Sequence, residues 1–186
     1  MCVLYTDDSI LAGPNKAELD QIIEDIKGTG LDITDEGDIA DFLGVNIQRE
    51  GESFHLTQPK LIDSILEDLH LKEDSHIKDI PMASSKLLSR HKESKDFDHH
   101  SNYGRVVGKL NFLEQSTCGD ISYATHMLAR FSTCPKVEHG AAVKWLGRCL
   151  LGTRDKGIIL SPDPTKGLEV HVDADFAGPQ ACRRGH

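Results

Sequence analysis

The feature that most constrains the fold is a pair of adjacent carboxylates, Asp7 and Asp8, between two short apolar segments. The flanking segments, Cys2 to Tyr5 and Ile10 to Ala12, favour strands, and the polar residues between them favour a turn. The sequence therefore predicts a β-hairpin with both carboxylates at its tip. Adjacent carboxylates repel each other unless a cation lies beside them, and their hard oxygen atoms suit Mg²⁺. The alternative is an ordinary solvated turn, because turns favour Asp in any case.

The composition is that of a globular protein of one or two domains. Of the 186 residues, 38% are hydrophobic, which is enough for a buried core. No apolar run reaches the roughly 18 residues needed to cross a bilayer, and the N-terminus lacks the pattern of a signal peptide. We therefore expect an intracellular protein that is neither secreted nor membrane-bound. The five cysteines form no CxxC pair, so Cys118, Cys134 and Cys149 are expected to pack as small hydrophobic residues.

The net charge of −9 bears on any interaction with nucleic acid. Neutralising phosphates requires Lys and Arg, so this charge argues against the chain holding a duplex by itself. The basic residues concentrate late, at residues 144–156 and 86–95, whereas the first eighty residues are strongly acidic. A local basic face is still compatible with this distribution.

Two helices and a hairpin are predicted in the first seventy residues. Asn15 can cap a helix that ends near Gly28, and Thr57 can cap a second helix with Pro59 in its first turn. Between the helices, residues 31–57 change to the two-residue period of strands. The apolar stripes of the two helices comprise Leu19, Ile22, Ile23 and Ile26 in the first, and Leu61, Ile62, Ile65, Leu66 and Leu69 in the second.

Three more helices are predicted after a polar connector over residues 70–101. They span Tyr103 to Gln115, Asp120 to Phe131 and Val137 to Leu151, and Pro135 and Gly152 punctuate the last two. Their expected buried stripes are Val106, Val107, Leu110 and Leu113; Ile121, Ala124, Leu128 and Phe131; and Val137, Ala141, Trp145 and Cys149.

The tail returns to strands, at residues 157–160 and 168–172. The second of these runs into Asp173-Ala174-Asp175. Carboxylates at the end of a strand suit metal-assisted phosphodiester chemistry. An ordinary acidic turn at the end of a strand is an equally simple explanation.

Six segments in a fixed order resemble one known family. They are YTDD, ITDEGDIADFLGVNI, HLTQPKLIDSIL, VVGKLNFL, DISYATHMLARFSTCPKVEHGAAVKWLGRCLLGT and VDADFAG. Together they resemble the polymerase region of copia-type retrotransposon polyproteins, from the Tyr-x-Asp-Asp box of the reverse transcriptase to the start of the RNase H domain. The similarity extends over nearly the whole chain. Each segment alone is a weak signal, but six in the right order make chance similarity a poor explanation.

The resemblance implies an α+β fold divided into four regions. Residues 1–57 would be part of the polymerase palm with its primer-grip hairpin, and residues 58–102 a helix followed by a polar connector. Residues 103–155 would be a helical thumb and connection module, and residues 156–186 the start of an RNase H-like domain.

The same resemblance implies RNA-directed DNA polymerase chemistry with Mg²⁺. Asp7 and Asp8 would be the palm carboxylates, and Asp173 the first RNase H carboxylate; all three would be catalytic and metal-binding residues. The implied partners are an RNA template, a DNA primer and the remainder of the polyprotein. The implied primer grip consists of Phe42, Leu43 and Gly44.

Departures from the family pattern lead us to expect a fragment that is inactive alone. The family's first palm Asp lies upstream of the box that begins at Tyr5, and its remaining RNase H carboxylates lie downstream of Asp173. Residues 117–121, Thr-Cys-Gly-Asp-Ile, stand where the family tends to have Thr-Arg-Pro-Asp-Ile, and the loss of Arg weakens a basic face. The alternative is a non-catalytic relic of a decayed retroelement. The sequence makes no prediction of the oligomeric state.

Overall fold

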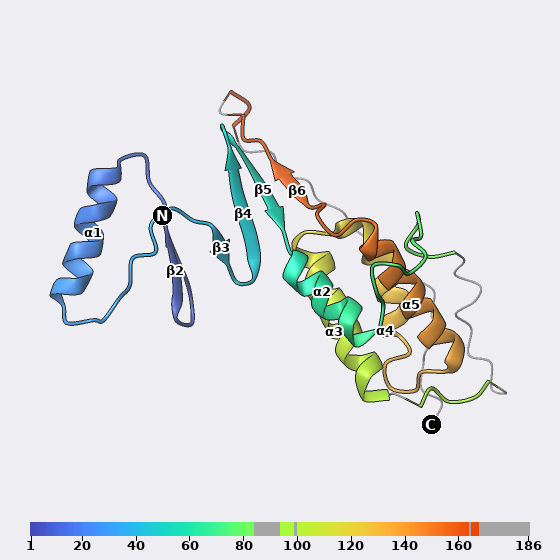
Figure 1. Ribbon diagram of the computed structural model, residues 1–186. Coiled ribbons are helices and arrows are strands. Elements are labelled where there is room, and N and C mark those ends of the chain that lie inside the picture. Colours follow the sequence, from blue (N-terminus) through green and yellow to red (C-terminus); the bar gives the residue numbers. More distant parts are fainter. Residues whose placement is uncertain (84–93, 99, 164, 168–186) are drawn as a thin grey trace.

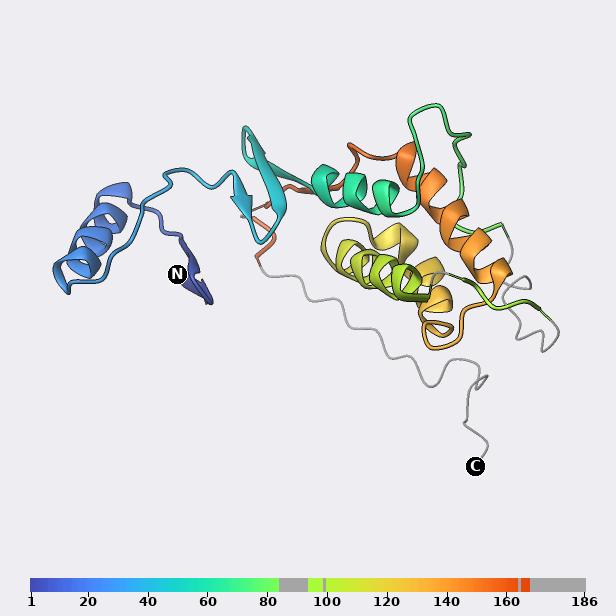
Figure 2. The same cartoon turned by 60° about the horizontal axis from the view of Figure 1, so that its bottom comes forward.

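The computed structural model describes residues 1–83, 94–98, 100–163 and 165–167, and its architecture is α+β. Figures 1 and 2 show an elongated arrangement, with a helical module at one end, a four-stranded sheet beside it, and a two-stranded hairpin with one helix at the far end. Within the described residues, no helix is long and apolar enough to cross a membrane.

The chain begins with the predicted hairpin. Strand β1 (Cys2–Tyr5) pairs antiparallel with β2 (Asp8–Leu11), and Tyr5 lies opposite Asp8. The turn therefore consists of Thr6 and Asp7, whereas Asp8 is the first residue of β2, so the prediction of both carboxylates at the tip is wrong by one residue. Tight pairing of Tyr5 with Asp8 leaves room for only two residues in the turn.

Helix α1 (Lys16–Gly28) follows the hairpin and begins where the sequence predicted. The Asn15 side chain accepts a hydrogen bond from the Ala17 backbone N–H at 3.0 Å and donates one to Glu18 at 3.1 Å. The first of these satisfies one of the open N–H groups of the first turn. The apolar stripe of α1 is not buried, and Ile22 is 43% exposed.

The central sheet has the order β3-β4-β5-β6, with all neighbours antiparallel. Strands β3 (Asp41–Phe42), β4 (Val45–Glu50) and β5 (Ser53–Thr57) are consecutive, and β6 (Ile158–Leu160) joins them from the far end of the chain. One sheet face is apolar, because residues directly opposite each other share a face. It carries one charged residue, Arg49, whose guanidinium lies over the Phe54 ring, and otherwise Phe42, Val45, Ile47, Phe54, Leu56, Ile158 and Leu160.

The helical module holds the hydrophobic core. It contains α2 (Pro59–Asp68), α3 (His100–Ser116), the 3₁₀ turn η2 (Gly119–Ile121), α4 (Ser122–Ala129) and α5 (Val137–Leu151). The predicted stripes of α2, α3 and α4 are confirmed, except that Leu61 is only half-buried. The fully buried large apolar side chains of this core are Ile62, Ile65, Val106, Leu110, Leu113, Ile121, Leu128, Val143, Leu146 and Leu150.

The predicted stripe of α5 is wrong in three of its four positions. Val137 and Ala141 are exposed and Trp145 is half-buried, while Cys149 is buried. Sequence patterns favour large apolar residues, but this helix packs through small ones and a histidine. Its buried face consists of His139, Gly140, Val143, Leu146, Gly147, Cys149 and Leu150.

The glycines of α5 let neighbouring segments approach closely. A Cβ on Gly147 would lie 2.6 Å from a Leu69 methyl group and 2.7 Å from one of Leu71, and a Cβ on Gly140 would lie 2.3 Å from the Phe97 ring. The chain that leaves α2 and the segment at residues 94–98 therefore pack directly against the α5 backbone. Glycine is needed at these two positions for space.

Three smaller expectations about the helical module are wrong. Gln58, and not Thr57, is the N-cap residue of α2, and its side chain is turned inward to accept a hydrogen bond from Thr117 at 2.9 Å. Cys134 is exposed, because it lies in the turn between α4 and α5. The predicted helix over residues 120–131 is split into η2 and the shorter α4.

Candidate functional site

Burial divides the chain sharply near residue 57. None of residues 1–56 is buried, whereas Thr57 and Gln58 are both buried. The same first 56 residues contain thirteen Asp and Glu residues against three Lys and Arg residues. The N-terminal part, which carries the predicted polymerase carboxylates, is therefore acidic and has no fully buried apolar residue.

Asp7 and Asp8 are both exposed at the end of the hairpin. Because Tyr5 pairs with Asp8 and Val3 pairs with Ile10, these four side chains share one face of the hairpin. The apolar residues of this face are open to solvent, with Val3 41% and Tyr5 59% exposed. The Asp8 carboxylate thus lies at the edge of an apolar surface that nothing described in the chain covers.

Thr6 adopts a backbone conformation that β-branched residues rarely take. Its φ is +51°, in the left-handed region. Such a conformation costs about 1–3 kcal/mol in a non-glycine residue and persists where the surrounding structure imposes it. Here the two-residue connection between Tyr5 and Asp8 imposes it, which fixes the direction in which Asp7 leaves the turn.

Asp7 and Asp8 do not by themselves make up a metal site. In the part of the chain that the structure describes, no three His, Cys, Asp or Glu side chains gather closely enough to hold a metal ion. Mg²⁺ prefers six oxygen ligands, of which carboxylates usually provide one or two. The donor chemistry of Asp7 and Asp8 fits Mg²⁺, and the other ligands would come from water, substrate phosphates or protein outside the described residues.

The predicted primer-grip residues form the tight turn between β3 and β4. Phe42 pairs with Val45, and the two residues between them, Leu43 and Gly44, have φ angles of +52° and +75°. Positive φ at both positions is the geometry of a type I′ hairpin turn. Among the described residues, no hydrogen bond or ion pair joins this turn to the Asp7 hairpin.

The third predicted carboxylate, Asp173, lies outside the described residues, as does Asp175. The strand predicted at residues 157–160 is confirmed as β6, which pairs with β5 and so belongs to the same sheet as the β3–β4 turn. Ser161, just beyond β6, lies 2.8 Å from Ser53 between their Oγ atoms. The division of the chain at residue 156 stays a prediction.

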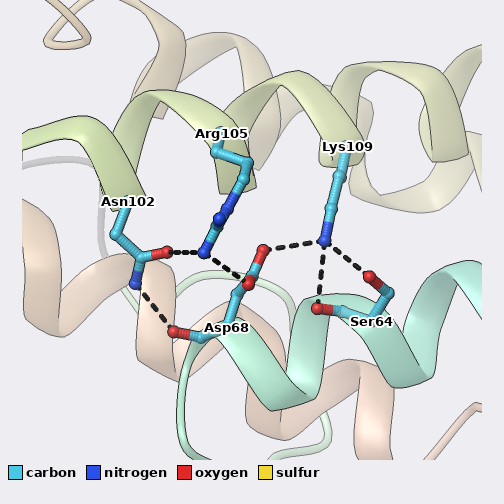
Figure 3. Close-up of polar contacts among 5 residues, drawn as sticks. All are labelled: Ser64, Asp68, Asn102, Arg105 and Lys109. Carbon is cyan, nitrogen blue, oxygen red and sulfur yellow. Dashed lines mark hydrogen bonds and ion pairs between the residues drawn. The ribbon is translucent and has the colours of Figure 1, made fainter.

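A polar cluster between α2 and α3 was missed by sequence reasoning. The Asp68 carboxylate accepts hydrogen bonds from Arg105 at 2.7 Å and from Lys109 at 2.8 Å, and Lys109 also donates to Ser64 Oγ at 2.5 Å. Asn102 donates to the Asp68 backbone oxygen at 2.7 Å (Figure 3). These residues are 34 to 45 positions apart across α2 and α3, so no local spacing signals the cluster.

One thiol of the helical module is electrostatically distinctive. Burial and, after it, the hydrogen bond from the thiol to the Asp120 carboxylate at 3.2 Å together raise the pKa of Cys118 to about 12. A thiol in this state is a poor nucleophile, because the thiolate is the reactive form. Cys118 is therefore a structural residue.

Several curated proteins similar to this chain are retrovirus-related Pol polyproteins from plant transposons. A retrovirus-related Pol polyprotein from transposon RE1 of Arabidopsis thaliana is 31% identical over 176 residues, and one from transposon TNT 1-94 of Nicotiana tabacum is 31% identical over 184 residues. Each match covers 95% of this chain. An uncharacterised mitochondrial protein of Arabidopsis thaliana is 26% identical over 98% of this chain and 74% of its own length.

The two polyproteins are much longer than this chain, which spans 12% and 14% of their lengths. No protein-family model matches the chain. No solved structure matches it either. The sequence similarity alone shows the relationship, because each match covers 95% of the chain. The chain is a homologue of one segment of the copia-type retrotransposon Pol polyproteins.

Proposed function

We propose that this chain is a segment of a reverse transcriptase that carries two of the palm carboxylates, Asp7 and Asp8. The observation that supports this most strongly is the hairpin at residues 2–11, which presents a Tyr-x-Asp-Asp sequence at a tight exposed turn in a homologue of Pol polyproteins. We also propose that Phe42, Leu43 and Gly44 form a primer grip. The type I′ turn at Leu43 and Gly44 supports this second proposal.

In the complete enzyme, Asp7 and Asp8 would hold Mg²⁺ beside the primer terminus. Two bound ions roughly 4 Å apart would activate the primer 3′-hydroxyl and stabilise the leaving pyrophosphate. The task of this chain is positional: the constrained Thr6 turn holds the Asp7 carboxylate, and pairing with Tyr5 holds Asp8. The substrates would be a deoxynucleoside triphosphate, a DNA primer and an RNA template.

The charge distribution indicates where nucleic acid would be held. Residues 1–56 repel phosphate, because they carry ten more acidic than basic side chains. Phosphate contacts would therefore come from the helical module and from the rest of the polyprotein. The 186-residue chain alone should show no primer extension, because no third ligand joins Asp7 and Asp8 among the described residues. We expect no cleavage of an RNA–DNA hybrid either, because the family resemblance implies that Asp173 acts together with further carboxylates. Primer extension by the isolated chain that Asp7→Asn abolishes would contradict this expectation. So would hybrid cleavage by the isolated chain that Asp173→Asn abolishes.

The test is a chimaera in which residues 1–186 replace the matching segment of an active relative. We expect RNA-templated DNA synthesis by the chimaera and its loss on Asp7→Asn or Asp8→Asn, with circular dichroism unchanged. Asp32→Asn, which removes the same charge from an exposed loop, should keep full activity. Undiminished synthesis by the Asp7→Asn chimaera would refute the catalytic assignment. A folded but inactive chimaera would favour the relic.

A further inference from the structure

A cavity of about 310 Å³ opens between the end of α2, the first turns of α3 and the first half of α5. Pockets that bind small molecules range from about 300 to 1,000 Å³ and combine an apolar lining with a few polar groups. The apolar part of this lining consists of Leu69, Phe97, Tyr103, Val106 and Val143. The Phe97 and Tyr103 rings meet edge to face, with centroids 6.2 Å apart.

The polar part of the lining is cationic. Lys144 is exposed, and its ammonium group makes no hydrogen bond or ion pair with any described residue. Arg105 binds Asp68 and Asn102 through Nη2 alone, and its side chain is 61% exposed. Asp68 is the only acidic group among the described lining residues, and Arg105 and Lys109 already neutralise it. In a chain of net charge −9, this is a local excess of positive charge.

His70 adds a third basic side chain, at a position where glycine would be less strained. The Leu71 N–H binds the Leu66 oxygen at 2.9 Å and the His70 N–H binds the Glu67 oxygen at 3.0 Å, which is the Schellman pattern at the end of α2. His70 is the left-handed residue of this motif, with φ of +53°. This position usually carries glycine, so the imidazole is kept at the cavity rim at a cost in stability.

We propose that this cavity binds one nucleotide unit of a single nucleic-acid strand. Base and sugar would lie against the apolar lining, and the phosphate would lie between Lys144, Arg105 and His70. Proteins hold single strands in this way, through basic groups for the backbone and aromatic or apolar surface for the bases. The choice of a nucleic-acid ligand rests on the proposed function. Binding in this cavity would give the helical module a phosphate contact that the acidic residues 1–56 cannot make.

The test is binding of thymidine 5′-monophosphate to the 186-residue chain, followed by NMR or calorimetry. The nucleotide should bind more tightly than thymidine, which lacks the phosphate, and more tightly than inorganic phosphate, which lacks the base and the sugar. Lys144→Gln should weaken binding about tenfold, the loss of one charge-assisted hydrogen bond. Lys60→Gln, which removes an exposed lysine from the other end of α2, should leave binding unchanged.

His70→Gly separates a binding role from a structural one. Removing the strained side chain should raise the unfolding temperature by about 2–4 °C. The same change should weaken nucleotide binding at least threefold, so stability and affinity would move in opposite directions. Binding that Lys144→Gln and His70→Gly leave unchanged would overturn the proposal, as would inorganic phosphate binding as tightly as the nucleotide. The measurement needs no polymerase activity, so either proposal can fail while the other stands.

Discussion

The carboxylate of Asp68 lies 2.8 Å from Nζ of Lys109, and this contact joins the end of α2 to the middle of α3. The two side chains are only 14% and 24% exposed, so water screens the pair weakly. Through Arg105 and Asn102, the same carboxyl-bearing residue also fixes the first turns of α3, as Figure 3 shows. The cluster therefore determines how α2 is oriented on the helical core.

We expect Asp68→Asn to lower the free energy of unfolding by about 1–3 kcal/mol, because it leaves two cations beside a neutral group in a partly buried site. Urea denaturation monitored by circular dichroism measures this. The control is Asp20→Asn on α1, whose partner Lys16 is 84% exposed; we expect a change below about 0.5 kcal/mol there. Equal effects of the two substitutions would contradict the structural role of Asp68.

Two glycine substitutions should act in opposite directions. Gly147→Ala places a Cβ 2.6 Å from Leu69 and should destabilise the chain by about 1–3 kcal/mol through overpacking. Gly108→Ala, on an exposed turn of α3 with open space around it, should stabilise it by about 0.5–1 kcal/mol through helix propensity. Thermal unfolding of both variants is the measurement. A stabilising Gly147→Ala would show that α2 and α5 pack less closely than described.

The alkaline limb of the stability profile should depend on Tyr103. Burial raises the pKa of Tyr103, whose hydroxyl donates to the Leu128 oxygen at 2.9 Å. Because the folded pKa exceeds that of the unfolded chain, this contribution to stability is complete below about pH 10 and is lost as the pH rises further. Tyr103→Phe should cost about 1 kcal/mol at pH 7 and flatten the decline above pH 10. Urea titrations from pH 7 to 11 test this, and parallel profiles would contradict it.

The cysteines should differ in their reaction with iodoacetamide at pH 8. Cys2 and Cys134 are exposed and should react quickly. Cys118 and Cys149 should react slowly, because burial raises the pKa of both thiols and leaves little thiolate. Mass spectrometry of peptides over a time course gives the four rates. Alkylation of Cys118 as fast as that of Cys2 in the folded protein would show that its site is open.

The sequence predicted those parts of the fold that depend on local spacing. The stripes of α3 and α4 were correct because large apolar residues recur three and four positions apart, and the cap at Asn15 was correct because its partner, Ala17, is two residues away. The α5 stripe was wrong because Gly140 and Gly147 pack by their small size, which hydrophobic patterns do not register.

Contacts between distant segments could not be predicted in the same way. Ser53 and Ser161 are 108 positions apart, and Asp68 and Lys109 are 41 apart, so only the folded chain brings them together. At the candidate site, the sequence predicted the hairpin that carries Asp7 and Asp8, whose catalytic and metal-binding roles stay predictions. It did not predict that the turn itself holds only Thr6 and Asp7, because that depends on the register of Tyr5 with Asp8.

We propose that residues 1–56 need further parts of a polymerase to cover their apolar faces, whereas the helical module buries its own core. Hydrogen exchange, compared between the 186-residue chain and the chimaera, tests it most directly. In the chain alone, amides around Asp7 and Asp8 should exchange quickly, because no residue before Thr57 is buried, while those around Leu128 and Leu146 should be protected. In the chimaera both regions should be protected. Strong and equal protection of both regions in the isolated monomer would contradict the account.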